Sequence, residues 1–400
     1  METLDWSNLG FGYRKTDGNV RCIYKDGAWG EVQVSADENI TLHMAATCLH
    51  YGQDAFEGLK AFRGKDGKVR IFRLEANAER LQSSCDGIMM PRVSTELFRE
   101  MVTKVVALNE RFVPPYESGA SLYIRPLLIG TSAQVGVSPS KEYLFVIFVT
   151  PVGPYYKAGF AVNNCVIFRD IDRAAPLGTG RFKVGGNYAA GMRASYAAHE
   201  QGYSCEIYLD AKEKKYIDEC GAANFIGIKG NSYITPKSTS ILPSITNNSL
   251  MQIARDMGMT VEQRPVPEEE LSAFDEAGAC GTAAVISPIG RIDDVEQGTV
   301  NLVITKDLSR LGRDMRESSY YAEQFFPENQ IRYIAIADNF DSETENVMAP
   351  FQFAMNEVYL RDGSRKIKDV LKMKRQRGEY CACAPYGYMK HSQNKDVLVP

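Results

Sequence analysis

The chain has 400 residues, of which 44% are hydrophobic and 24% charged, with a formal net charge of −4 and a pI near 5.8. This is the composition of a globular chain long enough for two or three domains, without an overall bias toward nucleic acid or membrane. The N-terminal METLDWSNLG has no basic region followed by an apolar core, and no apolar run reaches membrane-spanning length. We therefore expect a cytoplasmic protein with no membrane partner.

Helical and strand-like segments are mixed along the chain, which predicts an α/β (α+β) protein. TELFREMVTKVVALNERF (95–112) has a helical pattern, whereas LYIRPLLIG (122–130) and YLFVIFVTPVG (143–153) are β-type runs. Prolines and glycines follow the last run directly, which is typical of a chain crossing from one lobe to another. We place a domain boundary between residues 150 and 160.

The cysteines indicate a reducing compartment. They are nine in number and scattered, without the spacing of a metal site: Cys22, Cys48, Cys85, Cys165, Cys205, Cys220, Cys280, Cys381 and Cys383. An odd number of scattered cysteines favours reduced thiols over a disulfide framework.

One lysine stands in an unusual segment. FKVGGNYAAG (182–191) sets Lys183 among glycines and small apolar residues, with no acidic partner beside it. The plain alternative is a loop cation, and GTGRFKVGG also resembles a phosphate-binding loop, although it lacks the G-K-[ST] ending. A lysine packed closely and without an acidic partner can lose its proton and act as a nucleophile. Lys183 is therefore a candidate catalytic residue.

A lysine that carries pyridoxal 5'-phosphate needs an acid near the ring nitrogen, a hydroxyl near the phenolic oxygen, and cationic and backbone donors for the phosphate. Glu219 in YIDECGAANFIGI is a candidate acid, and Arg80 in NAERL is a candidate phosphate cation. LPSITNNSL (242–250) has the pattern of a turn that opens a helix, whose free N–H groups favour an anion. Taken singly, Glu219 is more simply a strand-end surface acid, and Arg80 is more simply a cation on the face of a helix.

In this order, the motifs from residue 1 to about 297 resemble the branched-chain amino acid aminotransferases, which are fold-type IV pyridoxal-phosphate enzymes. The resemblance implies a small N-terminal domain at 1–152 and a cofactor-binding domain at 153–297. The matching motifs are YGQDAFEGLKAFRGKDG (51–67), FRLEANAERL (72–81), SLYIRPLLIGT (121–131), TPVGPYY (150–156), RFKVGGNYAA (181–190), DECGAANFIGI (218–228), LPSITNNSL and GTAAVISPI (281–289).

The resemblance also implies roles for individual residues. Lys183 would carry the cofactor and act in turn as nucleophile and general base. Arg80 would bind the phosphate, Tyr188 would approach the phenolic oxygen, and Glu219 would pair with the ring nitrogen. Backbone N–H groups and hydroxyls would complete the phosphate site at Ile245, Thr246 and Thr282. The family resemblance further implies a homodimer.

The expected reaction is transfer of an amino group from leucine, isoleucine or valine to 2-oxoglutarate. Such a site needs apolar walls, yet it must accept the charged side chain of glutamate in a ping-pong cycle. Tyr123 and Arg125 lie two apart on a strand and so share a face, and by resemblance Arg125 meets the distal carboxylate of glutamate. The candidate wall residues, which as strand aromatics also read as core, are Tyr51, Phe56, Tyr155 and Tyr188, together with Ala283.

Related reactions remain as alternatives. A D-amino acid aminotransferase or an aminodeoxychorismate lyase uses the same fold type, although YGQDAFEGLKAF and SLYIRPLLIG favour the branched-chain group. Mammalian branched-chain enzymes carry a redox CxxC where this chain has AAVIS (283–287), so that switch is absent.

The last quarter, residues 298–400, resembles part of the catalytic domain of a large serine recombinase and predicts an αβ appendage. DLSRLGRD (307–314) matches the family's arginine motif, so Arg310 and Arg313 would contact the scissile phosphate. RYIAIADNFDS resembles the strand after it, and a basic helix would include 361–378. The nucleophilic serine has no counterpart, so we expect no recombination and no DNA partner, and the alternative is an inactive DNA-binding fragment. The appendage replaces the segment that closes the aminotransferase, which predicts impaired activity.

Overall fold

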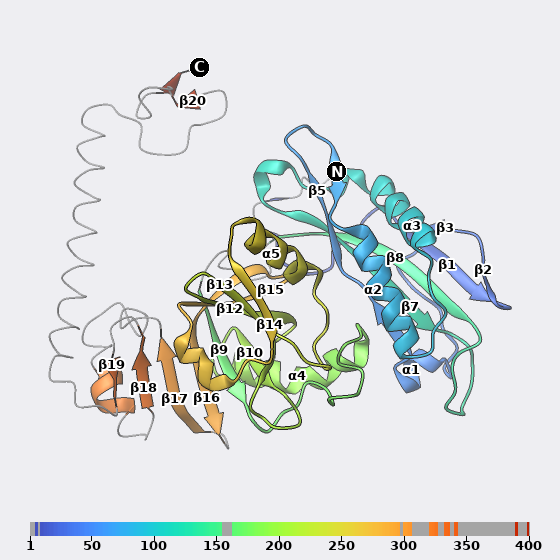
Figure 1. The fold of residues 1–400 in the computed structure, drawn as a ribbon. Coiled ribbons are helices and arrows are strands. Elements are labelled where there is room, and N and C mark those ends of the chain that lie inside the picture. Colours follow the sequence, from blue (N-terminus) through green and yellow to red (C-terminus); the bar gives the residue numbers. More distant parts are fainter. Residues whose placement is uncertain are drawn as a thin grey trace. The chain divides into compact units, whose positions relative to one another are not determined.

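The computed structural model describes residues 5–6, 9–153, 162–296, 299–305, 320–326, 332–336, 340–342, 389–390 and 398–399. The chain divides into two units, residues 1–300 and 301–400. In the first unit, helices and strands are mixed throughout, as expected (Figure 1). None of the described helices is long and apolar enough to cross a bilayer.

The first unit begins with an antiparallel sheet. Its strand order is β2-β1-β8-β7-β5-β6, with β3 paired to β1 and β4 paired to β7. The two longest strands, β7 and β8, confirm the β-type runs predicted from the sequence. The strands are β1 (Asn19–Lys25), β2 (Ala28–Trp29), β3 (Gln33–Ser35), β4 (Asp54–Phe56), β5 (Leu59–Arg63), β6 (Val69–Ile71), β7 (Ser121–Gly130) and β8 (Tyr143–Val152).

Two helices, α2 (Leu74–Gly87) and α3 (Thr95–Leu108), pack beside each other against this sheet, and the short α1 (Thr47–Tyr51) precedes β4 (Figure 1). Ser94 caps α3 by accepting a hydrogen bond from the N–H of Leu97. The helix predicted over 95–112 ends at Leu108, where the C-cap residue Asn109 donates to the carbonyl of Val105 both through its N–H at 3.2 Å and through its side chain at 2.8 Å. A 3-10 turn, Glu110–Phe112, follows.

Pro126 lies in the middle of β7, where a proline normally removes a ladder hydrogen bond. The neighbouring strand is interrupted at this point, since β4 pairs with β7 up to Phe56 and β5 resumes at Leu59. The carbonyl of Pro126 accepts from the N–H of Glu57 at 2.8 Å. In an extended strand the N–H and C=O of one residue point to the same side. The N–H that Pro126 lacks would therefore have faced the interruption between β4 and β5, where no ladder partner needs it. The interruption also turns Glu57 out of the ladder.

The remainder of the first unit forms a closed ring of strands. Each neighbouring pair in the order β9-β10-β11-β12-β15-β16-β9 is hydrogen-bonded, and β13 and β14 extend the sheet beyond β12. The strands are β9 (Asn163–Phe168), β10 (Cys205–Leu209), β11 (Ile217–Cys220), β12 (Ala223–Lys229), β13 (Ser232–Pro236), β14 (Thr260–Arg264), β15 (Glu276–Gly281) and β16 (Val285–Glu296).

Two helices accompany this ring: α4 (Gly185–Glu200) packs on β9 and β10, and α5 (Ile245–Asp256) packs on β14 and β15. A 3-10 turn, Glu268–Ala273, follows β14. The helix predicted to open at LPSITNNSL is confirmed, because α5 begins at Ile245 and the Ser244 side chain caps it. Both helices begin at the end of a loop that carries candidate site residues, so their N-termini lie in the site region.

The described part of the second unit is small. Strand β17 (Thr299–Thr305) pairs in parallel with β18 (Arg332–Ala335), and β18 pairs with β19 (Phe340–Asp341). β18 falls within the strand expected in RYIAIADNFDS. A π-helical turn, Tyr321–Phe325, and the pair β20 (Met389–Lys390) and β21 (Leu398–Val399) complete the described elements. Arg310, Arg313 and the basic segment 361–378 lie outside the described residues.

Candidate active site

The backbone of Lys183 is held between the two sheets of the first unit. Its N–H donates to the Ser84 hydroxyl of α2 at 2.9 Å, and its carbonyl accepts from Phe56 of β4 at 3.1 Å. The Asp54 carboxylate accepts from the N–H of Gly185 at 2.8 Å and so caps α4 from the other sheet. A Cβ on Gly185 would lie 2.5 Å from Asp54 Oδ1, so this close approach requires glycine.

Asn187, in the first turn of α4, fixes the loop that precedes Lys183. Its Nδ2 donates to the carbonyls of Thr179 and Phe182 at 2.8 and 2.9 Å, and its Oδ1 accepts from the Thr179 hydroxyl at 2.7 Å. The side chain therefore uses its donors and acceptor within one loop. These hydrogen bonds fix the GTGRF segment against the first turn of α4, and thereby fix the direction of the Lys183 side chain.

The Lys183 amine lies between aromatic rings. Its Nζ donates to the Tyr188 hydroxyl at 2.6 Å and lies 4.7 Å from the Phe56 ring centroid. Burial, with help from the Arg80 guanidinium, lowers the pKa of Lys183 to about 8. Burial, with help from the Glu219 carboxylate, raises the pKa of Tyr188 to about 12. The amine therefore loses its proton far more readily near neutral pH than an ordinary lysine does, whereas the phenol keeps its proton.

Arg80 lies on α2 and is held by a buried carboxylate. Its Nε and Nη2 donate to the two oxygens of Glu57 at 2.8 and 2.7 Å, in the bidentate geometry of a strong pair. Asn77 donates to the same carboxylate at 2.8 Å. The Arg80 Nη1 donates to the carbonyl of Pro243 at 2.9 Å, two residues before α5 begins. The cation therefore meets the N-terminus of α5, where Ile245 and Thr246 present N–H groups without helical partners.

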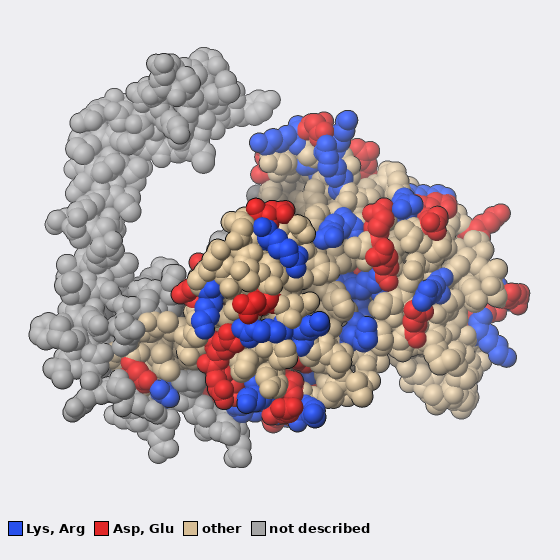
Figure 2. Space-filling model, viewed as in Figure 1, with Lys and Arg blue, Asp and Glu red and all other residues tan. Residues whose placement is uncertain are grey.

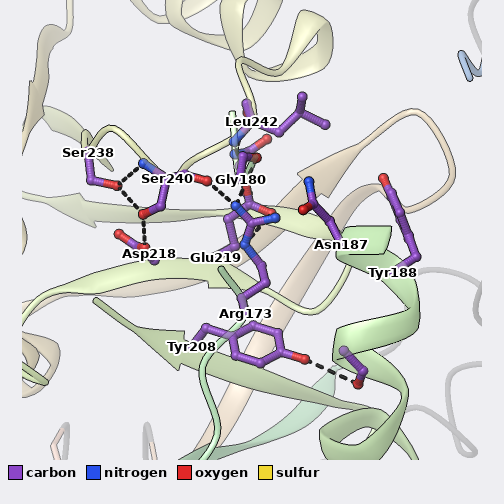
Figure 3. A network of polar contacts seen from close by, with 12 residues as sticks. Arg173, Gly180, Asn187, Tyr188, Tyr208, Asp218, Glu219, Ser238, Ser240 and Leu242 are labelled. Carbon is purple, nitrogen blue, oxygen red and sulfur yellow. Dashed lines mark hydrogen bonds and ion pairs between the residues drawn. The ribbon is translucent and has the colours of Figure 1, made fainter. Parts of the chain in front are cut away.

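Glu219 lies at the end of β11, in a hairpin with β12, and is buried. Its Oε1 accepts from the N–H of Leu242 at 2.6 Å, and its Oε2 lies 3.6 Å from Arg173 Nε, which is an ion pair without a hydrogen bond (Figure 3). Burial raises the pKa of Glu219 to about 7, and the Arg173 guanidinium opposes this rise. One carboxylate oxygen is thus left without a close donor among the described residues.

Arg173 is held in place by backbone carbonyls. Its Nη2 donates to Gly180 at 3.1 Å and to Ser240 (Figure 3). The Ser240 hydroxyl donates in turn to Asp218, the neighbour of Glu219. Arg173 Nε and Asp218 Oδ1 are buried without a hydrogen-bond partner among the described residues. Buried polar atoms are normally paired, so the unpaired Arg173 Nε beside Glu219 indicates a place where a ligand can bind.

A cavity of about 490 Å³ adjoins this network. Tyr188, Glu219 and Arg173 line it, together with Leu242 and the small residues of the turn between β15 and β16. Ala283 is in that turn, and its carbonyl accepts from Lys60 of the first sheet at 3.4 Å. Thr282 lies in the same turn and is half-buried. The volume is in the range of pockets for small molecules and cofactors.

The proposed substrate side lies against the same lysine. Arg125 projects from β7 over the Phe56 ring at 4.8 Å, and its Nη2 donates to the Tyr123 hydroxyl at 3.1 Å. Phe56 also lies 4.9 Å from the Tyr188 ring. The Nε of Arg125 is buried without a hydrogen-bond partner in the described part of the chain, so this cation keeps a donor available for an anion.

Two predicted wall residues stand apart from this group. Tyr51 ends α1 and is exposed, and its hydroxyl donates to the carbonyl of Val135. Tyr155 lies outside the described residues. The structure therefore brings together Lys183, Arg80, Tyr188 and Glu219, with Phe56, Tyr123 and Arg125, and places Tyr51 at the surface of the single chain.

Two residues of this site are missing from the sequence prediction. Glu57 lies inside the motif YGQDAFEGLKAFRGKDG, and its signal was an acidic residue within an apolar run, since such a residue is buried only when it is paired. Arg173, in DRAAPLGTG, carried no comparable signal. Both act on other site residues through space, so their roles depend on the folded structure.

Comparison with known proteins identifies the family. Residues 54–292 match the family "Amino-transferase class IV", and residues 290–380 match "Resolvase, N terminal domain". The chain is 51% identical over 299 residues to a branched-chain-amino-acid aminotransferase of Haemophilus influenzae, covering 73% of this chain and 87% of that protein. A branched-chain-amino-acid aminotransferase of Helicobacter pylori is 49% identical over 295 residues, with the same coverage of 73% and 87%.

Solved structures agree with this match. The branched-chain amino acid aminotransferase of Escherichia coli has a TM-score of 0.60 at 27% identity, covering 71% of this chain and 90% of that chain. The branched-chain aminotransferase of Thermoproteus uzoniensis, solved with norvaline, has a TM-score of 0.58 at 27% identity over 68% of this chain and 88% of that one. The predicted fold-type IV architecture is confirmed, and the chain belongs to the branched-chain amino acid aminotransferases of class IV, with a resolvase-like segment after them.

Proposed function

We propose that this chain transfers the amino group of leucine, isoleucine or valine to 2-oxoglutarate, with Lys183 as its catalytic residue. The observation that carries the proposal is the Lys183 amine, whose pKa is lowered to about 8 and whose Nζ contacts Tyr188 beside a cavity that Glu219 lines. The D-amino acid aminotransferase and the lyase are not favoured, because the similar proteins are branched-chain enzymes.

Pyridoxal phosphate is the cofactor of this family, and the residues present fit it. The cavity of about 490 Å³ offers a carboxylate with one oxygen that lacks a close donor, a phenol, and the buried Arg173 Nε, which has no hydrogen-bond partner among the described residues. Lys183 would hold the cofactor covalently, and Glu219 and Tyr188 would hold its ring. Arg80, the first turn of α5 and Thr282 would hold its phosphate. When bound, the cofactor supplies an electron sink for the substrate carbon that loses its proton.

The side chains around it divide the remaining work. Once released, the Lys183 amine takes and returns a proton, which its lowered pKa permits near neutral pH. Glu219 presents its carboxyl group at the end of β11, and Arg173, 3.6 Å away, favours its ionised form against the burial that raises its pKa to about 7. Tyr188 donates through its hydroxyl, because burial keeps its pKa at about 12. Phe56 and Tyr188 exclude water from the amine.

Arg125 is the residue we propose to distinguish the two substrates. Its unpaired Nε and its contact with Tyr123 place a cation beside an aromatic wall formed by Phe56. A branched aliphatic side chain packs on the aromatic rings, whereas the distal carboxylate of glutamate pairs with the guanidinium. One pocket thereby accepts an apolar and an anionic side chain in turn.

We also propose a homodimer. The α1 segment and the loop after β7 lie together, since Gln134 donates to the carbonyl of Ala45 at 3.0 Å. This edge exposes large apolar side chains, among them Met44 at 82% and Val135 at 85% exposed. A cluster of exposed apolar residues marks an interaction surface, and its members are Met44, Leu49, Tyr51, Val135 and Val137. Loss of the dimer in a Val135→Glu/Val137→Glu variant, measured by analytical ultracentrifugation, tests this assignment.

The proposal places the enzyme in the cytoplasm, where cysteines without a disulfide framework remain free thiols. It divides the chain at 1–152, 153–297 and 298–400, in line with the separate sheets of the first unit.

DNA is not part of the proposal. On the face that Figure 2 shows, basic and acidic side chains of the described residues are intermingled.

The experiment that tests the function uses the purified full chain. We expect a visible absorption band from the covalently held cofactor, and glutamate formation from leucine and 2-oxoglutarate. D-alanine and 4-amino-4-deoxychorismate serve as competing substrates. A chain that takes up no pyridoxal phosphate, or that turns over only one of these competitors, would contradict the proposal.

A further inference from the structure

Three cysteines that are distant in the sequence meet inside the strand ring of the first unit. Their Sγ atoms are 3.2 Å apart for Cys165 and Cys205, 3.1 Å for Cys205 and Cys220, and 3.9 Å for Cys165 and Cys220. All three side chains are buried and reduced. Among the described residues, these three thiols form a group of potential metal ligands whose sulfur atoms all lie within 4.8 Å of one another.

Strand register brings the three together. Cys165 and Cys205 are direct partners on the parallel strands β9 and β10. Cys220 on the antiparallel β11 is the partner of Ile207, two residues along β10 from Cys205. Residues two apart on a strand share a face, so the three thiols converge on one side of three adjacent strands. Their positions are therefore set by the backbone of the ring.

We propose that Cys165, Cys205 and Cys220 form a binding site for a thiophilic divalent cation of the zinc class. A point equidistant from the three sulfurs lies about 2.0 Å from each within their plane, given their separations. A Zn–S bond is about 2.3 Å long, so the ion sits slightly out of that plane. The three sulfurs approach three corners of a tetrahedron, with the two contacts of Cys205 shorter than the third, so Cys205 moves outward when the ion binds.

The ligand set selects the kind of ion. Thiolates favour soft or borderline cations, whereas magnesium and calcium require oxygen ligands. Binding replaces three S–H bonds with three metal–sulfur bonds, releases three protons to solvent, and leaves the site with one net negative charge. Without an ion the three thiols are neutral and pack with the apolar core of the ring, including Ile207. The fold therefore does not depend on the metal.

The cavity of about 490 Å³ lies beside this cluster, because Cys205 and Glu219 both contribute to its lining. Glu219 and Cys220 are consecutive on β11 and so point to opposite faces of the strand, which directs Glu219 to the cavity and the three thiols to the core of the ring. Because Cys220 directly follows Glu219 on β11, the proposed metal site lies next to the candidate active site, although it shares no residue with the proposed cofactor site. The inference does not depend on the proposed function.

The test is a titration of the reduced full chain with Cd²⁺, whose bonds to sulfur give a charge-transfer absorption in the ultraviolet. We expect one Cd²⁺ per chain and competition by Zn²⁺. Single Cys165→Ala, Cys205→Ala and Cys220→Ala variants should each weaken binding by more than ~100-fold, the upper end of the loss from outer-shell changes. A Cys280→Ala variant removes a buried cysteine from β15 and is the matched control, which should bind as the parent does.

A second measurement uses the unaltered chain, so its result does not depend on whether the cysteine variants fold. In the unaltered chain, bound Cd²⁺ should slow alkylation of Cys165, Cys205 and Cys220 relative to the remaining cysteines, as read by peptide mass spectrometry. A Cys381→Ala/Cys383→Ala variant excludes a competing C-x-C site. Failure to bind, unchanged alkylation of the three, or binding that is lost only with Cys381 and Cys383 would each overturn the proposal.

Discussion

Two buried Arg–Glu pairs flank the Lys183 amine, and they are built differently. Arg80 and Glu57 are joined by two hydrogen bonds of 2.8 and 2.7 Å, with Asn77 adding a third to the carboxylate. Arg173 and Glu219 stay 3.6 Å apart, and Arg173 Nε is left unpaired among the described residues. The first pair is saturated within the protein, whereas the second keeps an oxygen and a donor free.

The difference between the two pairs indicates which member of each pair is available to contact a ligand. In the tight pair the carboxylate is used up, so the cation's remaining N–H groups face outward, toward the start of α5. In the loose pair the cation is anchored on the carbonyls of Gly180 and Ser240, and the carboxyl group of Glu219 keeps one oxygen without a close donor among the described residues. We therefore interpret Glu57 as the positioning partner of Arg80, and Arg173 as the positioning partner of Glu219.

The largest effect is expected between the two pairs, at Lys183. Lys183→Ala removes the proton acceptor and the nucleophile, and activity should fall by at least the ~10²–10⁴-fold typical of a general base. Some cofactor should still bind non-covalently through the Arg80 side. Lys60→Met is the matched control, because burial also lowers the pKa of Lys60 to about 8. If both variants lose the same activity in a leucine transamination assay, Lys183 contributes only as a buried cation and not as the proton acceptor.

The loose pair is broken by Glu219→Gln, which keeps the shape and removes the charge. Turnover should fall on the order of 10²–10³-fold, as when one stabilising group is removed from an active site, while cofactor affinity changes little. Glu206→Gln is the control, since this buried carboxylate lines the same cavity but is bonded to Tyr208 at 3.0 Å. Spectroscopic titration with pyridoxal phosphate separates the two quantities. Parallel losses of affinity and turnover would make Glu219 structural.

The tight pair is broken by Glu57→Gln, which leaves the Arg80 guanidinium buried without its counter-ion. Removing one partner of a buried pair costs about 3–5 kcal/mol, so urea unfolding should show a clear loss together with weaker cofactor binding. Asp86→Asn breaks the exposed pair with Arg92 at 2.6 Å and is the surface comparison, with no measurable loss expected. If both variants unfold alike, Glu57 does not hold Arg80 in the way described.

Arg173→Gln should have a smaller effect with a distinct pH signature. Arg173 opposes the burial that raises the pKa of Glu219 from 4.5 to about 7, so its removal raises that pKa further. The acidic limb of kcat against pH should move to higher pH. A raised carboxyl pKa stabilises the fold at low pH and loses that contribution as pH rises toward 7. In cofactor-free Arg173→Gln this loss should extend to higher pH, and an unshifted profile argues against the pairing.

The smallest effect is expected outside both pairs, at the junction with the resolvase-like segment. Val285 and Ile286 are 55% and 39% exposed at the turn that also carries Thr282 and Ala283. Apolar burial contributes about 25 cal/mol per Å², so covering such side chains adds stability. A chimera whose residues after 297 come from the Haemophilus influenzae relative should melt higher and turn over faster. Equal melting temperatures would show that the present segment already covers this edge.

The sequence alone determined the parts of the site whose chemistry is local. Lys183 and the start of α5 were predictable because glycines and helix-opening turns act between near neighbours, whereas Tyr188 entered through the family resemblance. The strands β7 and β8 were predictable from their own apolar runs. The motif order then identified the fold, since each motif carries its own turn or strand end.

The remaining contacts of the site depend on strand register and on packing between the two sheets, which only the folded structure shows. Glu57 contacts Arg80 because it lies in the break between β4 and β5, opposite Pro126. The residues of β4 and β5 do not by themselves predict that break. Arg173 reaches Glu219 through a loop anchored on distant carbonyls. The nine cysteines lacked metal-type spacing in the sequence, yet three of them converge on adjacent strands. Such contacts join residues far apart in the chain, and only folding sets their distances and their electrostatics.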